Sequence, residues 1–405
     1  MKPIKLKINT KTKKYSIIIG SNLGASFAKI VENNSINFKQ CLLIVDKKVS
    51  KRIVSKIKKS LSKKKICIHY FEANEINKSF KSIDIILNIL LKKNFSREDC
   101  VISIGGGITG DISGFAASLF KRGLKFINVP TTLLSQVDSS IGGKTGVNSK
   151  YGKNLIGSFY QPDLVISDIQ FLKTLPKREI ICGYGEILKH SLIMNRNFYN
   201  YLDYNVLNIL KLKSPFIEKA IFESCKIKKK IVEKDENEKN LRKVLNFGHT
   251  FAHAFEATLG FSNKLNHGEA VTLGIVSAIK FSLKNKYIKK NEFISIMDHI
   301  KKSKMPSEIQ DYFSIKSLNK LLSFMIKDKK NITNKINLIL LKKIGSPLIN
   351  NQYSIKIIKL FSPMNKASPP PVYHLTVGTP HHSVPSTPAA QYQHNLTQGL
   401  RLRRL

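Results

Sequence analysis

The sequence predicts an α/β domain followed by a mostly helical second half. Up to about residue 168, short runs rich in β-branched residues alternate with helical segments, which is the pattern of a mainly parallel sheet. After residue 170 the strand signal fades, and residues 216–234 carry apolar side chains at helical spacing. The runs expected to be strands are 15–19, 41–45, 66–70, 100–104, 125–129 and 164–167.

Length and composition predict two globular domains and a tail. A chain of 405 residues with 42% hydrophobic residues can build a core in each of two domains, which we place at 1–168 and 169–362. Residues 367–405 are rich in Pro, Ser, Thr, His and Gln, so they can bury little apolar surface, and we expect them to be disordered. This abrupt change also fits a frameshifted, read-through or artificially appended extension.

The formal net charge of +41 raises the question of a nucleic-acid partner. The lysines, however, are spread over nearly every amphipathic segment, as at 56–59, 228–230 and 301–304, and Ile and Asn are over-used as well. A genome-wide codon bias produces this pattern on solvated faces without a selected binding surface. We therefore expect no nucleic acid as partner and keep a basic nucleic-acid-binding protein as an alternative.

Cysteine usage and the N-terminus indicate a reducing compartment. Five cysteines, odd in number and without a C-x-x-C pair, support neither a disulfide framework nor a cysteine zinc site. Residues 1–7 alternate charge and apolarity, and no run approaches the ~20 apolar residues of a membrane span. We expect a cytoplasmic protein without a membrane partner.

A glycine-rich turn follows the predicted strand 100–104. Glycines at 105, 107 and 110 satisfy G-x-G-x-x-G between this strand and a helix-like run at 112–120, which suits a pyrophosphate at a helix N-terminus. The acidic ribose partner expected about 20 residues later is missing, so an ordinary Rossmann dehydrogenase fits poorly. Asp46, Glu75 and Lys78 are alternative nucleoside contacts, although each also suits an exposed loop charge.

A second glycine-dense stretch covers residues 138–154. Its Gly-Lys-Thr element resembles the end of a phosphate-binding P-loop, but Asp138 stands where the first glycine belongs. A nucleoside triphosphatase is therefore disfavoured. A loop with Asp138, Lys144, Lys153 and Asn154 still suits an anionic ligand, because glycine admits close backbone approach and lysine supplies charge.

Three separated fragments, 183–186, 246–253 and 267–270, place one carboxylate and two imidazoles within reach of one metal ion. We expect Glu186 at the start of a helix, and His267 at the start of another. His249, His253 and Glu256 are spaced to share one helix face. One Glu and two His leave a coordination position open, as a catalytic metal requires.

Together these strings resemble the 3-dehydroquinate synthase family over about residues 1–362. The resemblance implies a Rossmann-like NAD-binding α/β domain plus a mostly α-helical metal- and substrate-binding domain. It implies a homodimeric lyase that uses NAD and one divalent metal ion, zinc or cobalt. Its reaction would convert 3-deoxy-D-arabino-heptulosonate 7-phosphate into 3-dehydroquinate and phosphate, in the shikimate pathway to chorismate and aromatic amino acids. The implied steps are transient oxidation by NAD, phosphate elimination, re-reduction and intramolecular aldol closure.

The resemblance also implies roles for particular residues. The metal ligands would be Glu186, His249 and His267. The NAD contacts would be Asp46, Glu75, Lys78, Gly105, Gly106, Gly107, Asp111, Thr131, Thr132, Lys153, Thr174 and Leu175. The substrate and catalytic residues would be Asp138, Lys144, Asn154, Lys189, Lys228, Arg242, Asn246, His253 and, reaching in from a second subunit, Arg122. Asp328-Lys329-Lys330 matches a late motif in which one lysine contacts substrate.

Departures from the family pattern are few. Ala73-Asn74-Glu75 stands where Asp-Gly-Glu is usual, Gly185 where alanine is common, and Ala252 where glycine is common. The first departure keeps the Glu and the following Lys78, and neither of the other two removes a functional group. The nearest alternative is a metal- and NAD-dependent polyol dehydrogenase of the glycerol dehydrogenase type; another is a related sugar phosphate cyclase that makes an aminocyclitol precursor.

Overall fold

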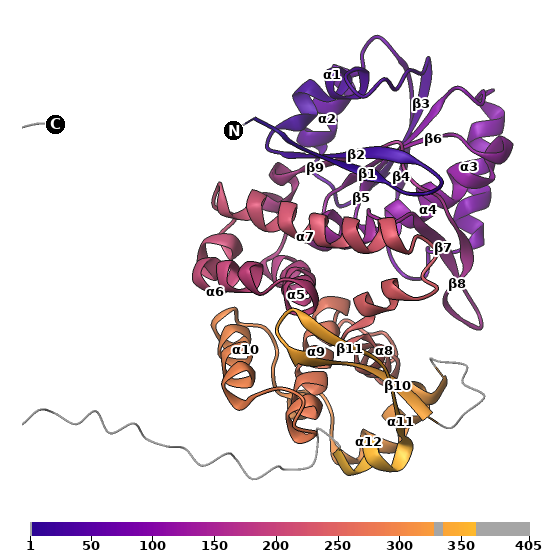
Figure 1. The fold of residues 1–405 in the computed structure, drawn as a ribbon. Coiled ribbons are helices and arrows are strands. Elements are labelled where there is room, and N and C mark those ends of the chain that lie inside the picture. Colours follow the sequence, from indigo (N-terminus) through magenta and orange to yellow (C-terminus); the bar gives the residue numbers. More distant parts are fainter. Residues whose placement is uncertain (1, 328–334, 362–405) are drawn as a thin grey trace, which may run out of the picture. The chain divides into compact units, whose positions relative to one another are not determined.

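The computed structural model describes residues 2–327 and 335–361. Seven strands form one sheet in the order β1-β2-β9-β6-β5-β3-β4, parallel except for the β1–β2 pair (Figure 1). These strands are β1 (Ile4–Asn9), β2 (Lys14–Gly20), β3 (Gln40–Asp46), β4 (Lys65–Phe71), β5 (Cys100–Gly105), β6 (Lys125–Pro130) and β9 (Leu164–Asp168). The six predicted strands are confirmed, and β1 is an additional strand at the sheet edge.

Helices cover both faces of the sheet. They are α1 (Phe27–Glu32), α2 (Lys51–Ser60), α3 (Phe80–Lys92) and α4 (Gly107–Leu119). Leu43 and Val45 of β3 share a buried cluster with α1 and α2, whereas Leu42 and Ile44 share one with α3 and α4. All seven residues of β3 are buried for this reason, as is usual for a central parallel strand.

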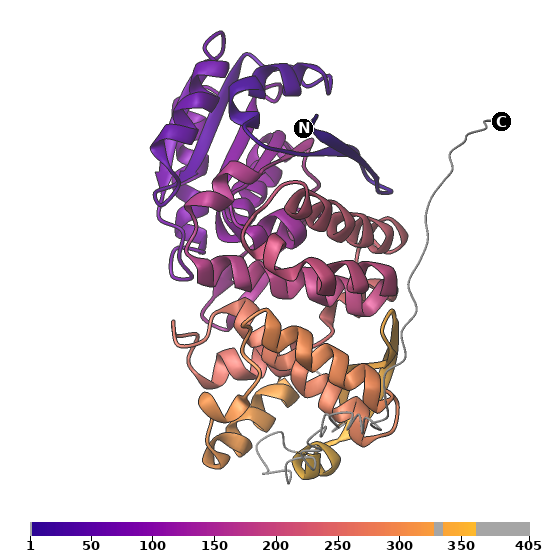
Figure 2. The ribbon, with the colours of Figure 1, turned by 90° about the vertical axis from the view of Figure 1, so that its left-hand side faces the viewer.

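The second half is mostly helical, as predicted. Its helices are α5 (Lys177–Met194), α6 (Arg196–Leu210), α7 (Phe216–Lys234), α8 (His249–Thr258), α9 (His267–Lys284), α10 (Lys290–Lys302), α11 (Leu318–Lys327) and α12 (Ile355–Phe361). Short helical turns are η1 (Leu23–Ser26), η2 (Phe120–Arg122), η3 (Ser135–Ser139), η4 (Ile169–Thr174), η5 (Leu241–Asn246), η6 (Ile309–Asp311) and η7 (Ile315–Ser317). Helix α5 packs against α6, α7 and α9, and Figure 2 shows these helices in magenta and orange.

Two β-hairpins depart from the sequence predictions. The glycine-dense stretch expected as a loop contains β7 (Lys144–Ser149) and β8 (Gly152–Phe159), and buried Val147 anchors this hairpin in the cluster with α4. In the helical half, β10 (Lys335–Lys343) pairs with β11 (Ser346–Ser354). Leu340 and Leu341 are fully buried, and Leu341 N donates to Ser282 Oγ of α9 at 3.1 Å. Packing on α9 therefore stabilises a strand pair within the half of the chain that the sequence analysis expected to be mostly helical.

The described residues, 2–327 and 335–361, belong to one compact unit, and the predicted tail at 367–405 lies outside them. The predicted domain boundary near residue 168 falls between β9 and α5 and stays a prediction. In the part of the chain that the structure describes, no helix has both the length and the apolarity needed to cross a membrane.

Candidate metal and substrate site

Glu186, His249 and His267 lie close enough together to share one metal ion. Glu186 lies within α5, His249 begins α8 and His267 begins α9. One ligand atom from each side chain lies within 4.8 Å of the others, and His249 Nε2 is 3.8 Å from Glu186 Oε1. The structure thus brings together the three fragments grouped by the sequence analysis.

Hydrogen bonds orient both imidazoles. His249 Nδ1 is 3.2 Å from Phe247 O, and His267 Nδ1 is 3.2 Å from Glu256 Oε2. Because a carbonyl or carboxylate oxygen can only accept, each Nδ1 donates and a neutral ring keeps its lone pair on Nε2. Burial, then the charge of Lys189, holds the pKa of His249 well below its ordinary value. Burial lowers the pKa of His267, but the hydrogen bond and charge of Glu256 outweigh it and raise that pKa above its ordinary value.

The Glu186 carboxylate fits a cation. Both of its oxygens are buried, and neither accepts a hydrogen bond from a described residue. Lys189 forms an ion pair with Oε2, although the angles are not those of a hydrogen bond. An incompletely paired buried carboxylate costs several kcal/mol. A divalent ion held by this oxygen and two imidazole nitrogens would remove that cost and keep a coordination position open.

Glycines bring α5 close to its neighbours. A Cβ on Gly268 would lie 2.3 Å from Cys182 Sγ, and one on Gly183 would lie 2.5 Å from Leu134 N. The small residues therefore let α5 approach both the start of α9 and the segment after β6. The expectation that Glu186 begins a helix is wrong, since α5 begins at Lys177. Gly183 and Gly185 resemble a helix boundary in sequence but serve close packing within the helix.

Asp138 links the metal cluster to the basic residues. Lys228 Nζ donates to both Asp138 O and Asp138 Oδ1 at 2.6 Å. Asp138, Glu186 and His190 also offer ligand atoms within 4.8 Å of one another. Burial raises the pKa of Asp138, but the charges of Lys228 and Lys189 outweigh it and hold the pKa well below its ordinary value.

The sequence analysis missed His190. Its Nδ1 lies 2.6 Å from Ser224 Oγ, and its Nε2 is 3.8 Å from Asp138 Oδ1. Burial lowers the pKa of His190 well below its ordinary value, which favours the neutral ring. Its spacing of one helical turn from Glu186 was the available signal.

Lys144 and Asn246 meet at a carboxylate that the sequence analysis also missed. Glu238 forms an ion pair with Lys144 and accepts a hydrogen bond from Asn246 Nδ2 at 3.0 Å. Arg242, only 2% exposed, donates from Nη2 to Gly142 O at 3.0 Å and from Nη1 to Glu236 O. The pKa of Lys228 is lowered by burial and further by the charge of Arg242, against the opposing effect of Asp138. These cations therefore lie around one region next to the metal cluster.

The predicted nucleotide contacts lie at the carboxyl edge of the sheet. Strand β3 pairs with both β4 and β5, so the chain order reverses at β3 and β5, where open α/β sheets bind ligands. Asp46 ends β3, Gly105 ends β5, and α4 begins at Gly107, within the glycine run rather than at residue 112. Thr131 N, after β6, donates to Gly105 O at 2.9 Å. A helix N-terminus thus lies at the switch point, as pyrophosphate binding requires.

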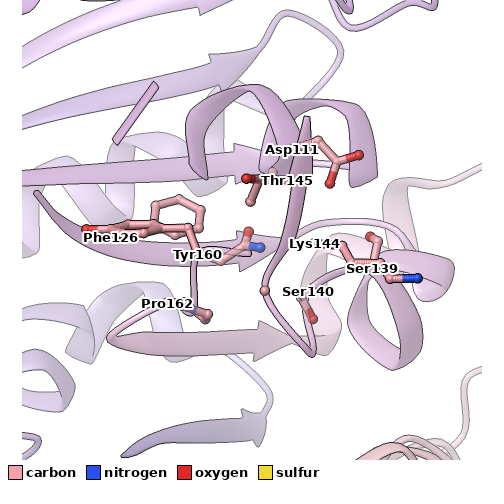
Figure 3. A pocket seen from close by; sticks show the side chains of 11 residues that line it. Asp111, Phe126, Ser139, Ser140, Lys144, Thr145, Tyr160 and Pro162 are labelled. Carbon is pink, nitrogen blue, oxygen red and sulfur yellow. The ribbon is translucent and has the colours of Figure 1, made fainter. Parts of the chain in front are cut away.

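Ion pairs connect this edge to the β7–β8 hairpin. Lys78 Nζ contacts Asp111 Oδ2 and Asn154 Oδ1, both at 2.5 Å, and Lys153 Nζ is 3.0 Å from Glu75 Oε1. Residues assigned to the nucleotide and to the substrate are therefore adjacent. Asp111 and Lys144 line a cavity of about 10 Å³, which has room for about one water molecule and none for a nucleotide. Figure 3 shows the side chains around this cavity.

The remaining predicted residues are placed as follows. His253 lies one turn after His249, with ring centroids 5.6 Å apart. Thr174 ends η4, where its Oγ1 donates to Phe171 O at 2.8 Å, and Leu175 follows it. Thr132 Oγ1 bonds Ser135 Oγ at 2.8 Å, and Gly106 precedes α4. Exposed Arg122 lies at the turn between α4 and β6, and no described residue joins it to the site by an ion pair or hydrogen bond. Residues 328–330 lie outside the described residues.

The chain joins a parallel sheet, which has a glycine-rich turn at its switch point, to helices that gather one carboxylate and two imidazoles. This combination defines the class of two-part proteins that includes sugar phosphate cyclases and polyol dehydrogenases. Two family models match the chain: 3-dehydroquinate synthase N-terminal at 68–182 and 3-dehydroquinate synthase C-terminal at 183–331. The chain belongs to the 3-dehydroquinate synthase family.

Individual relatives agree. The chain is 63% identical over 358 residues to 3-dehydroquinate synthase of Pelagibacter ubique (strain HTCC1062), which covers 88% of this chain and 97% of the relative. It is 42% identical over 336 residues to the same enzyme of Alkaliphilus metalliredigens (strain QYMF), covering 83% and 92%. A 2-deoxy-scyllo-inosose synthase, solved with carbaglucose-6-phosphate, NAD+ and Co2+, matches with a TM-score of 0.80 at 25% identity over 88% of this chain and 98% of that one. Glycerol dehydrogenase of Schizosaccharomyces pombe shares the fold alone, with a TM-score of 0.62 at 16% identity over 89% and 92%.

Proposed function

We propose that the chain converts 3-deoxy-D-arabino-heptulosonate 7-phosphate into 3-dehydroquinate and phosphate. It is a lyase that uses NAD and one divalent metal ion, zinc or cobalt. One observation supports the proposal independently of family membership. Asp138 Oδ1 lies 2.6 Å from Lys228 Nζ, and a carboxylate oxygen of Asp138 lies within 4.8 Å of ligand atoms of Glu186 and His190. A metal cluster and a cluster of cations thus form one site, as a doubly anionic sugar acid requires.

The chain's own residues would bind and orient the substrate. Lys228 and Arg242 would hold the carboxylate, and Lys144 the phosphate, because ammonium and guanidinium groups pair with these anions. When bound at Glu186, His249 and His267, the metal would polarise a substrate hydroxyl, and NAD would accept and return a hydride. Cationic clamps of this kind contribute mainly through orientation. The phosphate group would therefore leave from a position where a positive charge already pairs with it.

NAD would lie across the carboxyl ends of β3 and β5. Gly105, Gly106 and Gly107 would face its pyrophosphate, because the glycine run and the start of α4 leave backbone N–H groups available there. Asp46 would bond a nucleoside hydroxyl. Burial raises the pKa of Asp46, although the Lys48 hydrogen bond and charge oppose this effect.

The working unit would be a cytoplasmic homodimer in which Arg122 reaches the site of the second subunit. Two features support this proposal. Arg122 is exposed, and the turn holds the backbone of Lys121 at φ 48° and of Arg122 at φ 65°, a conformation that residues other than glycine rarely adopt. Inactive Arg122→Ala and inactive His249→Ala chains, mixed and re-assembled, should recover part of the activity if the arginine acts across subunits. Mixtures without recovery would place Arg122 outside the partner's site.

Phosphate release tests the function. The chain is incubated with the heptulosonate phosphate, Zn2+ or Co2+ and catalytic NAD+, with and without chelator. We expect one phosphate released for each substrate consumed, loss of release with chelator, and no accumulated NADH. Net NADH formation with a simple polyol would indicate a dehydrogenase instead, and turnover of glucose 6-phosphate would indicate a different cyclase.

A further inference from the structure

A separate cavity lies at the carboxyl ends of β2 and β9, where α7 begins. Its volume is about 200 Å³. Ile19, Ile169 and Leu212 form the apolar part of its wall, and Lys2, Lys173 and Glu218 form the charged part. None of these residues belongs to the metal and substrate site described above.

Glu218 is the feature of this cavity that requires a partner. It lies in the first turn of α7, it is 5% exposed, and no described residue donates a hydrogen bond to either of its oxygens; Oε2 is fully buried, so Oε1 is the oxygen that a ligand in the cavity can reach. No ion pair reaches Glu218 from the residues that the structure describes. Because an unpaired buried carboxylate costs several kcal/mol, a positively charged hydrogen-bond donor in the cavity would be strongly stabilised.

Two ammonium groups line the same cavity. Lys2 and Lys173 are both exposed, and neither forms an ion pair within the described ranges. A simple cation would be repelled by these two lysines, and a simple anion would face the Glu218 carboxylate. A ligand with both charges satisfies both ends, while Ile19, Ile169 and Leu212 offer apolar surface to the rest of it.

We propose that this cavity binds a small zwitterion of the α-amino acid class with an apolar side chain. Its ammonium group donates to Glu218, and its carboxylate lies between Lys2 and Lys173. The inference stands on this cavity alone and is independent of the proposed reaction.

Helix α7 extends from this cavity to the metal and substrate site. Glu218 and Lys228 lie on the same helix, ten residues and therefore about 15 Å apart along its axis. The proposal concerns binding in the cavity, which can be measured without catalytic turnover at the other site.

Calorimetric titration of the full chain tests the proposal with three probes. L-leucine carries both charges, 4-methylpentanoate lacks the ammonium, and 3-methylbutylamine lacks the carboxylate. We expect saturable binding of leucine and at least about tenfold weaker binding of either analogue, a difference of about 1.4 kcal/mol. Absence of saturable leucine binding at millimolar concentration, or equal binding of 4-methylpentanoate, would overturn the proposal.

Two variants and a control locate the binding. Glu218→Gln and Lys173→Ala should each weaken leucine binding about tenfold. Glu223→Gln, on the same helix but outside the cavity lining, should leave it unchanged. Glu218→Gln should also unfold at an equal or higher urea concentration, because it removes an unpaired buried charge. A Glu218→Gln chain that binds leucine like the parent contradicts the assignment.

Discussion

Glu238 forms an ion pair with Lys144 and accepts a hydrogen bond from Asn246, so one carboxylate engages two side chains that we assign to the substrate. Side-chain bonds from Lys144 and Asn246, together with the Lys144 charge, outweigh burial and hold the pKa of Glu238 below its ordinary value. Its backbone has φ 56°, a left-handed conformation that costs energy in a residue with a side chain. Glu238 therefore lies where it would compete with a substrate anion.

Replacing Glu238 by Gln should increase the affinity for inorganic phosphate about three- to tenfold, because the neutral amide no longer neutralises Lys144. Titration calorimetry at low ionic strength measures this change. Glu98→Gln, an exposed carboxylate paired with Lys125, is the control and should leave phosphate binding unchanged. Weaker phosphate binding in Glu238→Gln would show that Glu238 helps to form the site rather than competing for it.

The sequence predicted the sheet and the metal cluster better than the residues around them. Strand runs such as 41–45 are hydrophobic throughout, and Glu186, His249 and His267 stand in short distinctive strings, so both could be read locally. Glu238 could not, because its contacts with Lys144 join segments 94 residues apart through a strained turn. The β10–β11 hairpin was missed although its two strands are adjacent in sequence, because a short apolar run such as 336–341 does not distinguish a strand from a buried helical segment by its periodicity.

Replacing His249 by Ala should abolish retention of a divalent metal and turnover while the sheet domain stays folded. The reason is that only two of the three proposed ligands, Glu186 and His267, remain after the change, whereas a catalytic metal site needs at least three protein ligands. Metal content after gel filtration, by mass spectrometry, and circular dichroism give the two readouts. His69→Ala, in the edge strand β4, is the matched histidine control. Full metal content in His249→Ala would remove it from the ligand set.

Replacing Glu256 by Gln should weaken Zn2+ binding about 10- to 100-fold without abolishing it. Glu256 accepts from His267 Nδ1 at 3.2 Å, which orients the ring and makes Nε2 a better donor to the metal. Competition with a chelator of known affinity measures the change, and Asp84→Asn, an exposed carboxylate of α3, is the control. An unaltered Zn2+ affinity would mean that packing alone orients His267.

Asp138 should contribute a stability that depends on pH. The Lys228 and Lys189 charges hold its pKa in the folded protein well below the ordinary value of about 3.9, despite burial. A lowered folded-state pKa stabilises the folded chain above the unfolded-state pKa, and this contribution is lost as the pH falls toward the folded-state value. At pH 7 the contribution is therefore fully present.

Asp138→Asn should lower the free energy of unfolding at pH 7 by about 3 kcal/mol, because Lys228 then stays buried without its counter-ion. The difference from the parent chain should persist at pH 5 and shrink below about pH 4. Urea unfolding of both chains in chelator at pH 7, 5 and 3.5 measures it, and the parallel change Asp84→Asn should show no such trend. A difference between Asp138→Asn and parent that stays constant from pH 7 to 3.5 would mean that the carboxylate contributes through shape rather than through its charge.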